Sequence, residues 1–330
     1  MRQKVFLKGV DKMEIVVLDG YSLNPGDLSW SDLAELGDLT VYERTPAEKI
    51  KERIGTAEII FTNKTPLAEE IFVDCPQLEY VGVLATGYNI VDVEAAAEYD
   101  VVVTNVPEYG TTAVAQHSFA LLLEMCNHIF EHNKAVKAGQ WSEVPDFCFW
   151  NSPVTELVGK KMGIVGYGNI GQRSGELAQA FGMEVLAYTP DPDPELENQR
   201  MSYVELDELW AKADVISLHC PLFEETEGMI NEETISKMKD DVLIINTARG
   251  KLIVEEDLAT ALNEGRVGGA GLDVLAHEPP EMDNPLLEAQ NTIITPHIAW
   301  AAQESRERLL DTAVNNLAEF LASRPKNVVN

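Results

Sequence analysis

Three side chains in the second half of the chain are of the types needed for proton transfer and anion binding. Arg249 lies in IINTARG, Glu278 in LDVLAHEPP and His297 in TPHIAW, and each follows an apolar run typical of a strand. The arginine fork pairs bidentately with a carboxylate and stays charged. Histidine exchanges a proton near neutral pH, and a neighbouring carboxylate favours its protonated form. Together these types suit proton transfer to a carbonyl group on an anionic substrate.

A glycine-rich turn, GYGNIG, lies between the apolar run KKMGIV and an amphipathic stretch. This G-x-G-x-x-G pattern, placed between a strand and a helix, indicates a dinucleotide site. Gly166 would permit the tight turn, Gly168 would let the backbone approach a pyrophosphate, and Gly171 would allow close contact between helix and strand. The backbone N–H groups of Asn169 and Ile170 are expected to reach the phosphates.

The end of the next predicted strand departs from the usual dinucleotide pattern. An acidic residue there normally binds the ribose hydroxyls, but this sequence has Thr189, within AYTPDPDP. No Lys or Arg follows nearby to bind a 2′-phosphate, and Asp191 and Asp193 would repel one. NAD(H) is therefore the expected cofactor, with NADP(H) kept as the alternative.

A dinucleotide site and these three side chains together predict hydride transfer to a 2-oxoacid. Each residue alone has an ordinary interpretation: Arg249 as a surface ion-pair partner, Glu278 as a solvated loop acid, and His297 as a structural histidine. Their combination on strand-end loops of one sheet favours an active site. The other histidines are interpreted as structural or surface residues: His117, His128, His132, His219 and His277.

In order and approximate spacing, NTARG, LDV followed by EP, and TPHIAW resemble the motifs of D-isomer-specific 2-hydroxyacid dehydrogenases. The resemblance runs from about Met13 to the C-terminal stretch. Within the family, LDGYSLNPGDLSW, TNVPEYGT and PDFCFW are most similar to glycerate dehydrogenases (hydroxypyruvate reductases). This implies reversible reduction of hydroxypyruvate or glyoxylate with NADH. Three alternatives stay open: D-lactate dehydrogenase, phosphoglycerate dehydrogenase, and a non-catalytic NAD(H)-sensing corepressor-like protein.

The resemblance also implies a role for each site residue. Arg249 would bind the substrate, Glu278 would favour the protonated form of His297, and His297 would be the acid/base. Substrate-binding positions are implied at Ala85, Thr86, Gly87 and Trp300, the first three through backbone N–H groups. Further cofactor contacts are implied at Cys220, Pro221, Thr247, Ala248 and Asp273, the last through the nicotinamide carboxamide. No metal is implied, and a homodimer formed through the cofactor domain is expected.

Strand and helix patterns alternate along the chain, which predicts an α/β fold. Strands are expected at 14–18, 39–43, 58–62, 80–84 and 101–105, and again at 161–166, 184–188, 215–219, 241–246, 267–273 and 292–295. Helices are expected at 46–54, 67–73, 92–98, 170–181, 205–212 and 301–322, with one long helix from 111 to 138. The predicted architecture is two Rossmann-like domains with parallel sheets. They are a discontinuous substrate domain (1–111 and 300–330) and a dinucleotide-binding domain (112–299).

Composition limits the classes of partner. The 330 residues include 55 acidic and 25 basic side chains, a formal charge of −30, which disfavours nucleic acid and anionic membranes as partners. The four cysteines are scattered, which argues against disulfides and a zinc site. No signal peptide or membrane span is expected, so the predicted location is cytoplasmic. Residues 1–12, before the first strand pattern, are expected to be an appended tail or a mis-assigned start.

Overall fold

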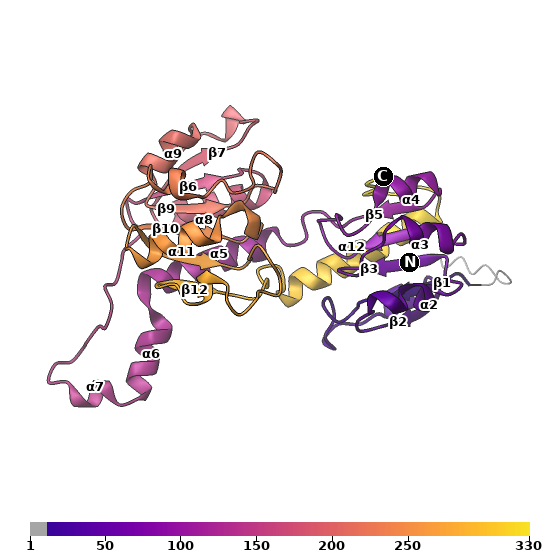
Figure 1. Ribbon diagram of the computed structural model, residues 1–330, viewed down its shortest axis with the longest axis horizontal. Coiled ribbons are helices and arrows are strands. Elements are labelled where there is room, and N and C mark those ends of the chain that lie inside the picture. The colour runs from indigo at the N-terminus through magenta and orange to yellow at the C-terminus, as the bar shows by residue number, and fades with distance from the viewer. Residues whose placement is uncertain (1–11) are drawn as a thin grey trace, which may run out of the picture. The chain divides into compact units, whose positions relative to one another are not determined.

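The computed structural model describes residues 12–330 and divides into two compact units (Figure 1). Unit 1 holds the described residues up to Gly110 together with Ala301–Asn330, and unit 2 is Thr111–Trp300. The expectation for the N-terminal tail lies outside the described residues, apart from Lys12, which is exposed. None of the helices within 12–330 is long and apolar enough to cross a membrane.

Unit 1 is a five-stranded parallel sheet in the order β2-β1-β3-β4-β5. Its strands are β1 (Glu14–Val17), β2 (Asp38–Val41), β3 (Ile59–Thr62), β4 (Tyr80–Val83) and β5 (Val102–Thr104). Its helices are α1 (Ser31–Ala34), α2 (Ile50–Ile54) after the 3₁₀ turn η1 (Ala47–Lys49), α3 (Glu69–Asp74), α4 (Val93–Glu98) and α12 (Gln303–Leu321).

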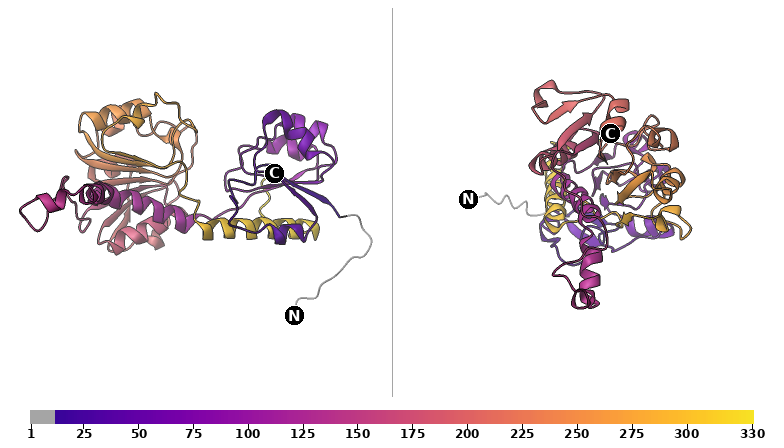
Figure 2. Two further views of the ribbon diagram at one scale, coloured as in Figure 1. Left: turned by 90° about the horizontal axis from the view of Figure 1, so that it is seen from below. Right: turned by 90° about the vertical axis from the view of Figure 1, so that its left-hand side faces the viewer.

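Both faces of the unit 1 sheet are covered because successive strand side chains point to opposite sides. Val16 and Ile60 face α2, α3 and α4, whereas Ile15 and Ile59 face α12. Figure 2 shows α12 (yellow) along the face opposite α3 and α4. The guanidinium of Arg306 on α12 donates to Asp27 at 2.6 and 2.8 Å. The C-terminal helix is therefore part of unit 1.

Unit 2 is a seven-stranded parallel sheet in the order β12-β11-β10-β9-β6-β7-β8. Its strands are β6 (Lys161–Val165), β7 (Glu184–Tyr188), β8 (Met201–Tyr203), β9 (Val215–Leu218), β10 (Val242–Asn246), β11 (Val267–Leu272) and β12 (Thr292–Ile294). Helices α5 (Thr111–Asn127) and α8 (Asn169–Ala180) pack on one face. The other face carries α9 (Leu206–Lys212), α10 (Glu232–Ile235) and α11 (Glu255–Asn263). The 3₁₀ turns are η2 (Pro194–Leu196), η3 (Gly250–Leu252) and η4 (Pro285–Leu287).

The predicted fold class, two Rossmann-like domains with parallel sheets, is confirmed. In unit 2 the strand order changes direction between β6 and β9, because β7 lies on one side of β6 and β9 on the other. Ligands of open α/β sheets bind at the carboxyl ends of strands on either side of such a switch point. This edge is where a dinucleotide is expected.

The predicted single helix over 111–138 is wrong, because the chain breaks at His128, whose φ is +48°. The backbone carbonyl of Cys126 accepts from the N–H of Thr155 instead of continuing the helix. Helix α6 (Ile129–Lys137) then leaves the body of unit 2 with α7 (Gln140–Glu143), as Figure 1 shows. We call residues 129–156 the arm; none of them is buried.

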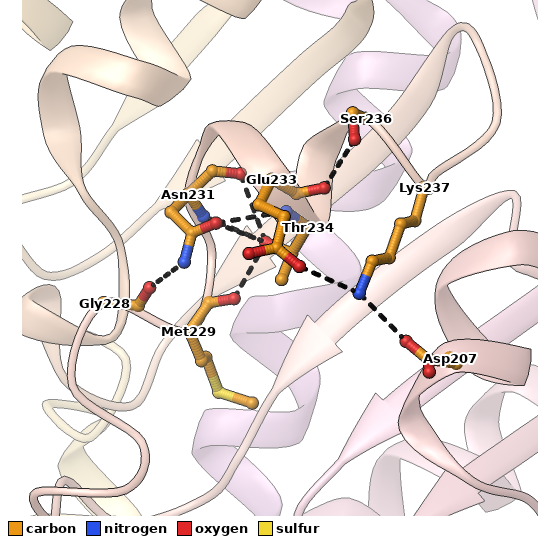
Figure 3. Close-up of polar contacts among 8 residues, drawn as sticks. All are labelled: Asp207, Gly228, Met229, Asn231, Glu233, Thr234, Ser236 and Lys237. Carbon is orange, nitrogen blue, oxygen red and sulfur yellow. Dashed lines mark hydrogen bonds and ion pairs between the residues drawn. The ribbon is translucent and has the colours of Figure 1, made fainter.

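A capping box fixes α10 and with it the segment beside η3 (Figure 3). The Asn231 side chain accepts from the N–H of Thr234 at 3.1 Å, and the Thr234 hydroxyl accepts from the N–H of Asn231 at 3.0 Å. Lys237 bridges Glu233 and Asp207, each at 3.2 Å. Just before this box, the N–H of Ile230 donates to the carbonyl of Leu252. The capping box therefore fixes a segment that is hydrogen-bonded to η3, the turn directly after Arg249.

Candidate active site

The glycine turn after β6 has the geometry that a pyrophosphate requires. Gly166 has a φ of +92°, and a Cβ there would lie 2.5 Å from the backbone nitrogen of Cys220. A Cβ on Gly171 would lie 2.2 Å from the carbonyl oxygen of Gly166, so both positions exclude larger residues. A Cβ on Gly168 would meet no atom within 4 Å. The residue at the start of α8 therefore faces open space, where a phosphate could contact the backbone.

Among residues 12–330, the segment after β7, where adenosine is expected, carries no cation suited to a 2′-phosphate. Thr189 follows β7, as predicted, and Asp191 is exposed beside it. The nearest basic residue along this segment, Arg200, precedes β8, whose residue Met201 pairs with Val185 in the first half of β7. Arg200 therefore lies toward the amino end of these strands, opposite Thr189. This arrangement favours NAD(H).

The segment after β9 faces the glycine turn across the switch point. Burial lowers the pKa of His219 to about 4, and its Nε2 lies 2.9 Å from the hydroxyl of Ser217. Burial also raises the pKa of the Cys220 thiol to about 11. Both side chains are therefore neutral at physiological pH and suit packing beside a dinucleotide better than proton transfer. Pro221 follows directly, in the predicted position.

Arg249 lies in a tight turn at the carboxyl end of β10. The buried Asn246 fixes this turn, because its side chain donates to the carbonyl of Arg249 at 2.8 Å and accepts from the N–H of Ala248 at 3.0 Å. The Arg249 guanidinium donates only to the carbonyl of Ala248, at 2.7 Å, among residues 12–330. It forms no ion pair within that range. An exposed arginine in this state can bind an anionic ligand.

Gly250 brings the Arg249 turn against the loop that carries Glu278. A Cβ at Gly250 would lie 1.9 Å from the carbonyl carbon of Leu275, so only glycine permits this approach. The Glu255 carboxylate, in the first turn of α11, accepts from the N–H of Ala276 at 2.8 Å and so holds the same loop. The two loops therefore form one rigid edge.

The Glu278 carboxylate and the His297 imidazole are hydrogen-bonded, with Oε2 2.6 Å from Nδ1. Both side chains are about one-third exposed, so the ring is open to a ligand on its other side. The other carboxylate oxygen of Glu278 accepts from the N–H of Leu275 at 3.2 Å. This pairing leaves Nε2 of His297 as the atom able to exchange a proton with a substrate.

The buried carboxylate of Asp273 holds the loop around His297. It accepts from the N–H of Ile298 at 2.9 Å and from that of Ala299 at 2.8 Å. The backbone N–H of His297 donates to the carbonyl of Asp273, and His297 adopts a left-handed φ of +54°. The indole N–H of Trp300 donates to the carbonyl of His297 at 2.9 Å. The contact of Asp273 with a nicotinamide carboxamide stays a prediction.

The predicted substrate-binding segment of unit 1 follows β4. Within residues 12–330, the backbone N–H groups of Ala85, Thr86 and Gly87 donate to no protein acceptor. The segment is nevertheless fixed, because the Thr86 hydroxyl donates to the carbonyl of Val106 at 2.8 Å and Asn105 donates to the carbonyl of Thr86 at 2.7 Å. Three free N–H groups on a fixed turn can bind an anion.

Sequence reasoning overlooks two residues that shape the Arg249 turn and one cation at the sheet edge of unit 1. Asn246 and Gly250 flank the Arg249 turn, and their signal is an asparagine ending an apolar run and a glycine directly after the arginine. Lys64 follows β3 and is exposed, with no ion pair in the described part of the chain. Its neighbour Asn63 donates to the carbonyl of Leu84 at 2.6 Å, which places this lysine at the same sheet edge as residues 85–87. The sequence could have indicated Lys64, because a basic residue just after a strand is uncommon in so acidic a chain.

Comparison with known proteins identifies the family. The model of the D-isomer specific 2-hydroxyacid dehydrogenase NAD-binding domain matches residues 119–299, more than half of the 330 residues. A hydroxypyruvate reductase of Blautia hydrogenotrophica is 59% identical over 321 residues, covering 96% of this chain and 100% of that protein. A glycerate dehydrogenase of Methylorubrum extorquens is 38% identical and covers 87% of this chain and 90% of its own length.

A solved structure agrees with these relatives. The D-lactate dehydrogenase of Aquifex aeolicus, complexed with NAD and lactic acid, matches with a TM-score of 0.79 and 31% identity over 94% of this chain and 96% of that one. Unit 2 is thus an NAD-binding domain, and the predicted cofactor and oxidoreductase class are confirmed. The chain belongs to the D-isomer specific 2-hydroxyacid dehydrogenase family.

Proposed function

We propose that this NAD(H)-dependent dehydrogenase reduces hydroxypyruvate, and glyoxylate as a smaller substrate, to the corresponding 2-hydroxyacids. The observation that carries the proposal is the Glu278–His297 pair at 2.6 Å, on a loop packed against the Arg249 turn through Gly250. These groups lie at the carboxyl ends of adjacent strands of an NAD-binding sheet. The 59% identical relative named hydroxypyruvate reductase supports this choice of substrate.

In this proposal, each residue acts on one part of the substrate. Arg249 of unit 2 binds the carboxylate, and its charge overcomes the repulsion of an anion by a chain of charge −30. The N–H groups of residues 85–87 in unit 1 are proposed as a further anion-binding turn. When bound, NADH supplies the hydride. His297 donates the proton to the substrate oxygen through Nε2, and Glu278, bonded to Nδ1, fixes the orientation of the ring.

The proposed cofactor contacts follow the glycine turn and the loops beside it. The backbone at Gly168, Asn169 and Ile170 would hold the pyrophosphate between the positions of Gly166 and Gly171. Further contacts are proposed along the same edge: Thr189, Cys220, Pro221, Thr247, Ala248 and Asp273. Trp300 would lie against the substrate, since it is bonded to the backbone of His297. We propose a preference for NADH over NADPH because cations are absent near Thr189 among the described residues.

The deciding experiment is oxidation of NADH and NADPH, followed at about 340 nm, with four 2-oxoacids. These are hydroxypyruvate, glyoxylate, pyruvate and phosphohydroxypyruvate. The proposal requires the highest kcat/KM with hydroxypyruvate and NADH. A preference for pyruvate would assign D-lactate dehydrogenase activity instead, and a preference for phosphohydroxypyruvate would assign phosphoglycerate dehydrogenase activity. Tight NADH binding without any turnover would favour an NAD(H) sensor.

His297→Ala tests the role of the proposed acid. It removes the proton donor but none of the loops that shape the dinucleotide site, so kcat should fall by at least about 10³-fold while the Kd for NADH changes little. Stopped-flow turnover and fluorescence titration with NADH measure the two quantities. The matched control is His277→Ala, on the exposed neighbour of Glu278, which should retain turnover. Turnover retained by His297→Ala would contradict the role assigned to His297.

We also propose that the protein is a homodimer formed through the arm. No residue of the arm is buried, yet it carries Phe130, Phe147 and Trp150 with 71%, 89% and 69% of their surfaces exposed. Apolar residues gathered on a projecting segment indicate an interface. A second copy of the chain is the proposed occupant, in keeping with the dimer that the family resemblance implies. The four cysteines are free, which supports the proposed cytoplasmic location.

A further inference from the structure

Two adjacent polar residues on α5, His117 and Ser118, contact the two loops that carry His297 and Arg249. The rest of this face is apolar and includes Val114, Phe119 and Leu121. The Nε2 of His117 lies 3.0 Å from the hydroxyl of Thr295. The hydroxyl of Ser118, which is fully buried, lies 2.9 Å from that of Thr247.

Both threonines occupy the same place relative to a site residue. Thr247 precedes Arg249 by two residues, and Thr295 precedes His297 by two residues. Two neighbouring positions of one helix therefore contact the two loops that carry the proposed substrate-binding arginine and the proposed acid. The packing between them is tight, because a Cβ on Gly271 of β11 would lie 2.9 Å from the Cβ of Leu121 on α5.

The direction of each hydrogen bond is fixed by its neighbours. The Thr295 hydroxyl donates to the Asp273 carboxylate at 2.6 Å, so His117 must donate to the Thr295 oxygen through Nε2. The Ser118 hydroxyl donates to the carbonyl of Val114 at 3.0 Å, so the Thr247 hydroxyl donates to Ser118. Replacing Ser118 with an apolar residue would leave the Thr247 hydroxyl without this acceptor. Replacing His117 with one would remove the donor to the Thr295 oxygen, while Thr295 would keep its bond to Asp273.

The His117 contact reaches the proposed acid through Asp273. The carboxylate of Asp273 is fully buried, and it holds the N–H groups of Ile298 and Ala299 as well as the Thr295 hydroxyl. Those bonds keep His297 in its left-handed conformation, which a non-glycine residue rarely adopts. Thr295 is thus held from two sides, by the carboxylate that it donates to and by the imidazole that donates to it.

We propose that His117 and Ser118 are positioning residues: α5 sets the relative placement of His297 and Arg249 by bonding to the threonine two residues before each. The proposal rests on the roles assigned above to these two residues. It gives His117 a part in catalysis that its interpretation as a structural histidine does not include. It also separates the two effects, because His117 acts on the acid and Ser118 acts on the group that binds the substrate carboxylate.

Steady-state kinetics on three variants test this separation. In His117→Phe the ring shape stays and the donor is lost, so kcat with hydroxypyruvate should fall by at least about 10-fold with little change in KM. In His117→Gln the amide nitrogen replaces Nε2 as donor, so kcat should recover to within about 3-fold of the wild type. In Ser118→Ala the Arg249 turn loosens, so KM for the 2-oxoacid should rise by at least about 5-fold with a smaller change in kcat.

The matched control is Gln116→Ala, on the exposed side of the same helix, which should leave both parameters unchanged. Equal changes of kcat and KM in His117→Phe and Ser118→Ala, parallel to a loss in Tm, would overturn the proposal by showing general loosening of α5. Failure of His117→Gln to recover turnover would also overturn it. If His117→Phe does not fold, the proposal is still tested by the kcat of His117→Gln and the KM of Ser118→Ala.

Failure of the proposed function is a separate outcome. It would be read from the wild type, which would then oxidise NADH with none of the four 2-oxoacids. The positioning of the loop has its own readout in that case, since crystal structures of His117→Phe and His117→Gln can be compared at His297. The left-handed φ of His297 should be lost in the first and kept in the second.

Discussion

Three histidines of unit 2 show how the surroundings of a side chain decide its chemistry. His297 is paired with Glu278 and one-third exposed, so it can meet a ligand. His117 is mostly shielded and donates to Thr295, so it is fixed in place. His219 directly precedes Cys220 and lies beside the Ser217 hydroxyl, and burial lowers its pKa to about 4. The same residue type is therefore assigned to catalysis, positioning and packing in one domain.

The partly buried His219 should make stability depend on pH. Its pKa lies at about 4 in the folded state, against an ordinary value of 6.5 that the unfolded chain regains. The unfolded state therefore binds the proton first, and stability falls as pH drops from about 6.5 toward about 4. His219→Gln should remove about 1–2 kcal/mol of this loss. Urea unfolding of both proteins at pH 7.5 and pH 5 measures the difference.

The control for this change is His277→Gln, because His277 is exposed. It should lose the same stability as the wild type between the two pH values. An equal loss in His219→Gln and the wild type would show that His219 does not bear the pH dependence.

At the scale of elements, the turn between β6 and α8 contains one glycine needed for packing and one that packing does not require. Gly171 permits packing, since a Cβ there would lie 2.2 Å from the carbonyl of Gly166. Gly168 has an ordinary φ of −79° and open space around it, so nothing in the protein itself requires a glycine. The proposed pyrophosphate contact would give a reason for glycine at this position, because it needs the backbone exposed.

Gly168→Ala should therefore fold normally but bind NADH weakly. We expect a Tm within about 2 °C of the wild type and a Kd for NADH raised by at least about 10-fold. Differential scanning fluorimetry with and without NADH measures both effects. Gly171→Ala is the contrasting variant and should lose stability even without the cofactor. Unchanged NADH affinity in Gly168→Ala would mean that the pyrophosphate does not approach this residue.

How far sequence reasoning reaches also differs among elements. Except for the three-residue β8, the strands and the loops after them could be predicted because apolar runs and the GYGNIG, NTARG and TPHIAW motifs are local patterns. The break at His128 could not, because the helical pattern continues through it and the bond from Thr155 that ends α5 comes from 29 residues along the chain. The His117–Thr295 contact, 178 residues apart in sequence, is likewise set by packing. Sequence locates the reactive residues, and tertiary contacts decide how they are held.

At the scale of the whole molecule, the arm leaves unit 2 with no apolar cover of its own. Phe130 and Phe147 are the two most exposed of the large apolar residues of the arm that a second copy would bury. A dimer that unfolds to separate chains gains stability with concentration, whereas a monomer does not. Oligomeric state and thermal stability should therefore change together.

Phe130→Asp combined with Phe147→Asp should give a monomer. Light scattering after size exclusion should find twice 36.5 kDa for the wild type and a single chain for the double variant. The wild-type Tm should rise with protein concentration, and that of the double variant should not. The control is Val73→Asp, at an exposed apolar residue of α3 in unit 1, which should remain dimeric. A wild type that runs as a monomer would refute the interface.

Gly250 has a consequence for how such enzymes acquire new substrates. Because its missing side chain lets the backbone after Arg249 lie against Leu275, a change in the length or shape of either loop must be matched in the other. A designer who transplants only one of them from a relative should obtain a poorly folded protein, whereas exchanging residues 246–255 and 273–284 as one cassette should succeed. Selection in nature would face the same restriction, so insertions in these two loops should be inherited as pairs.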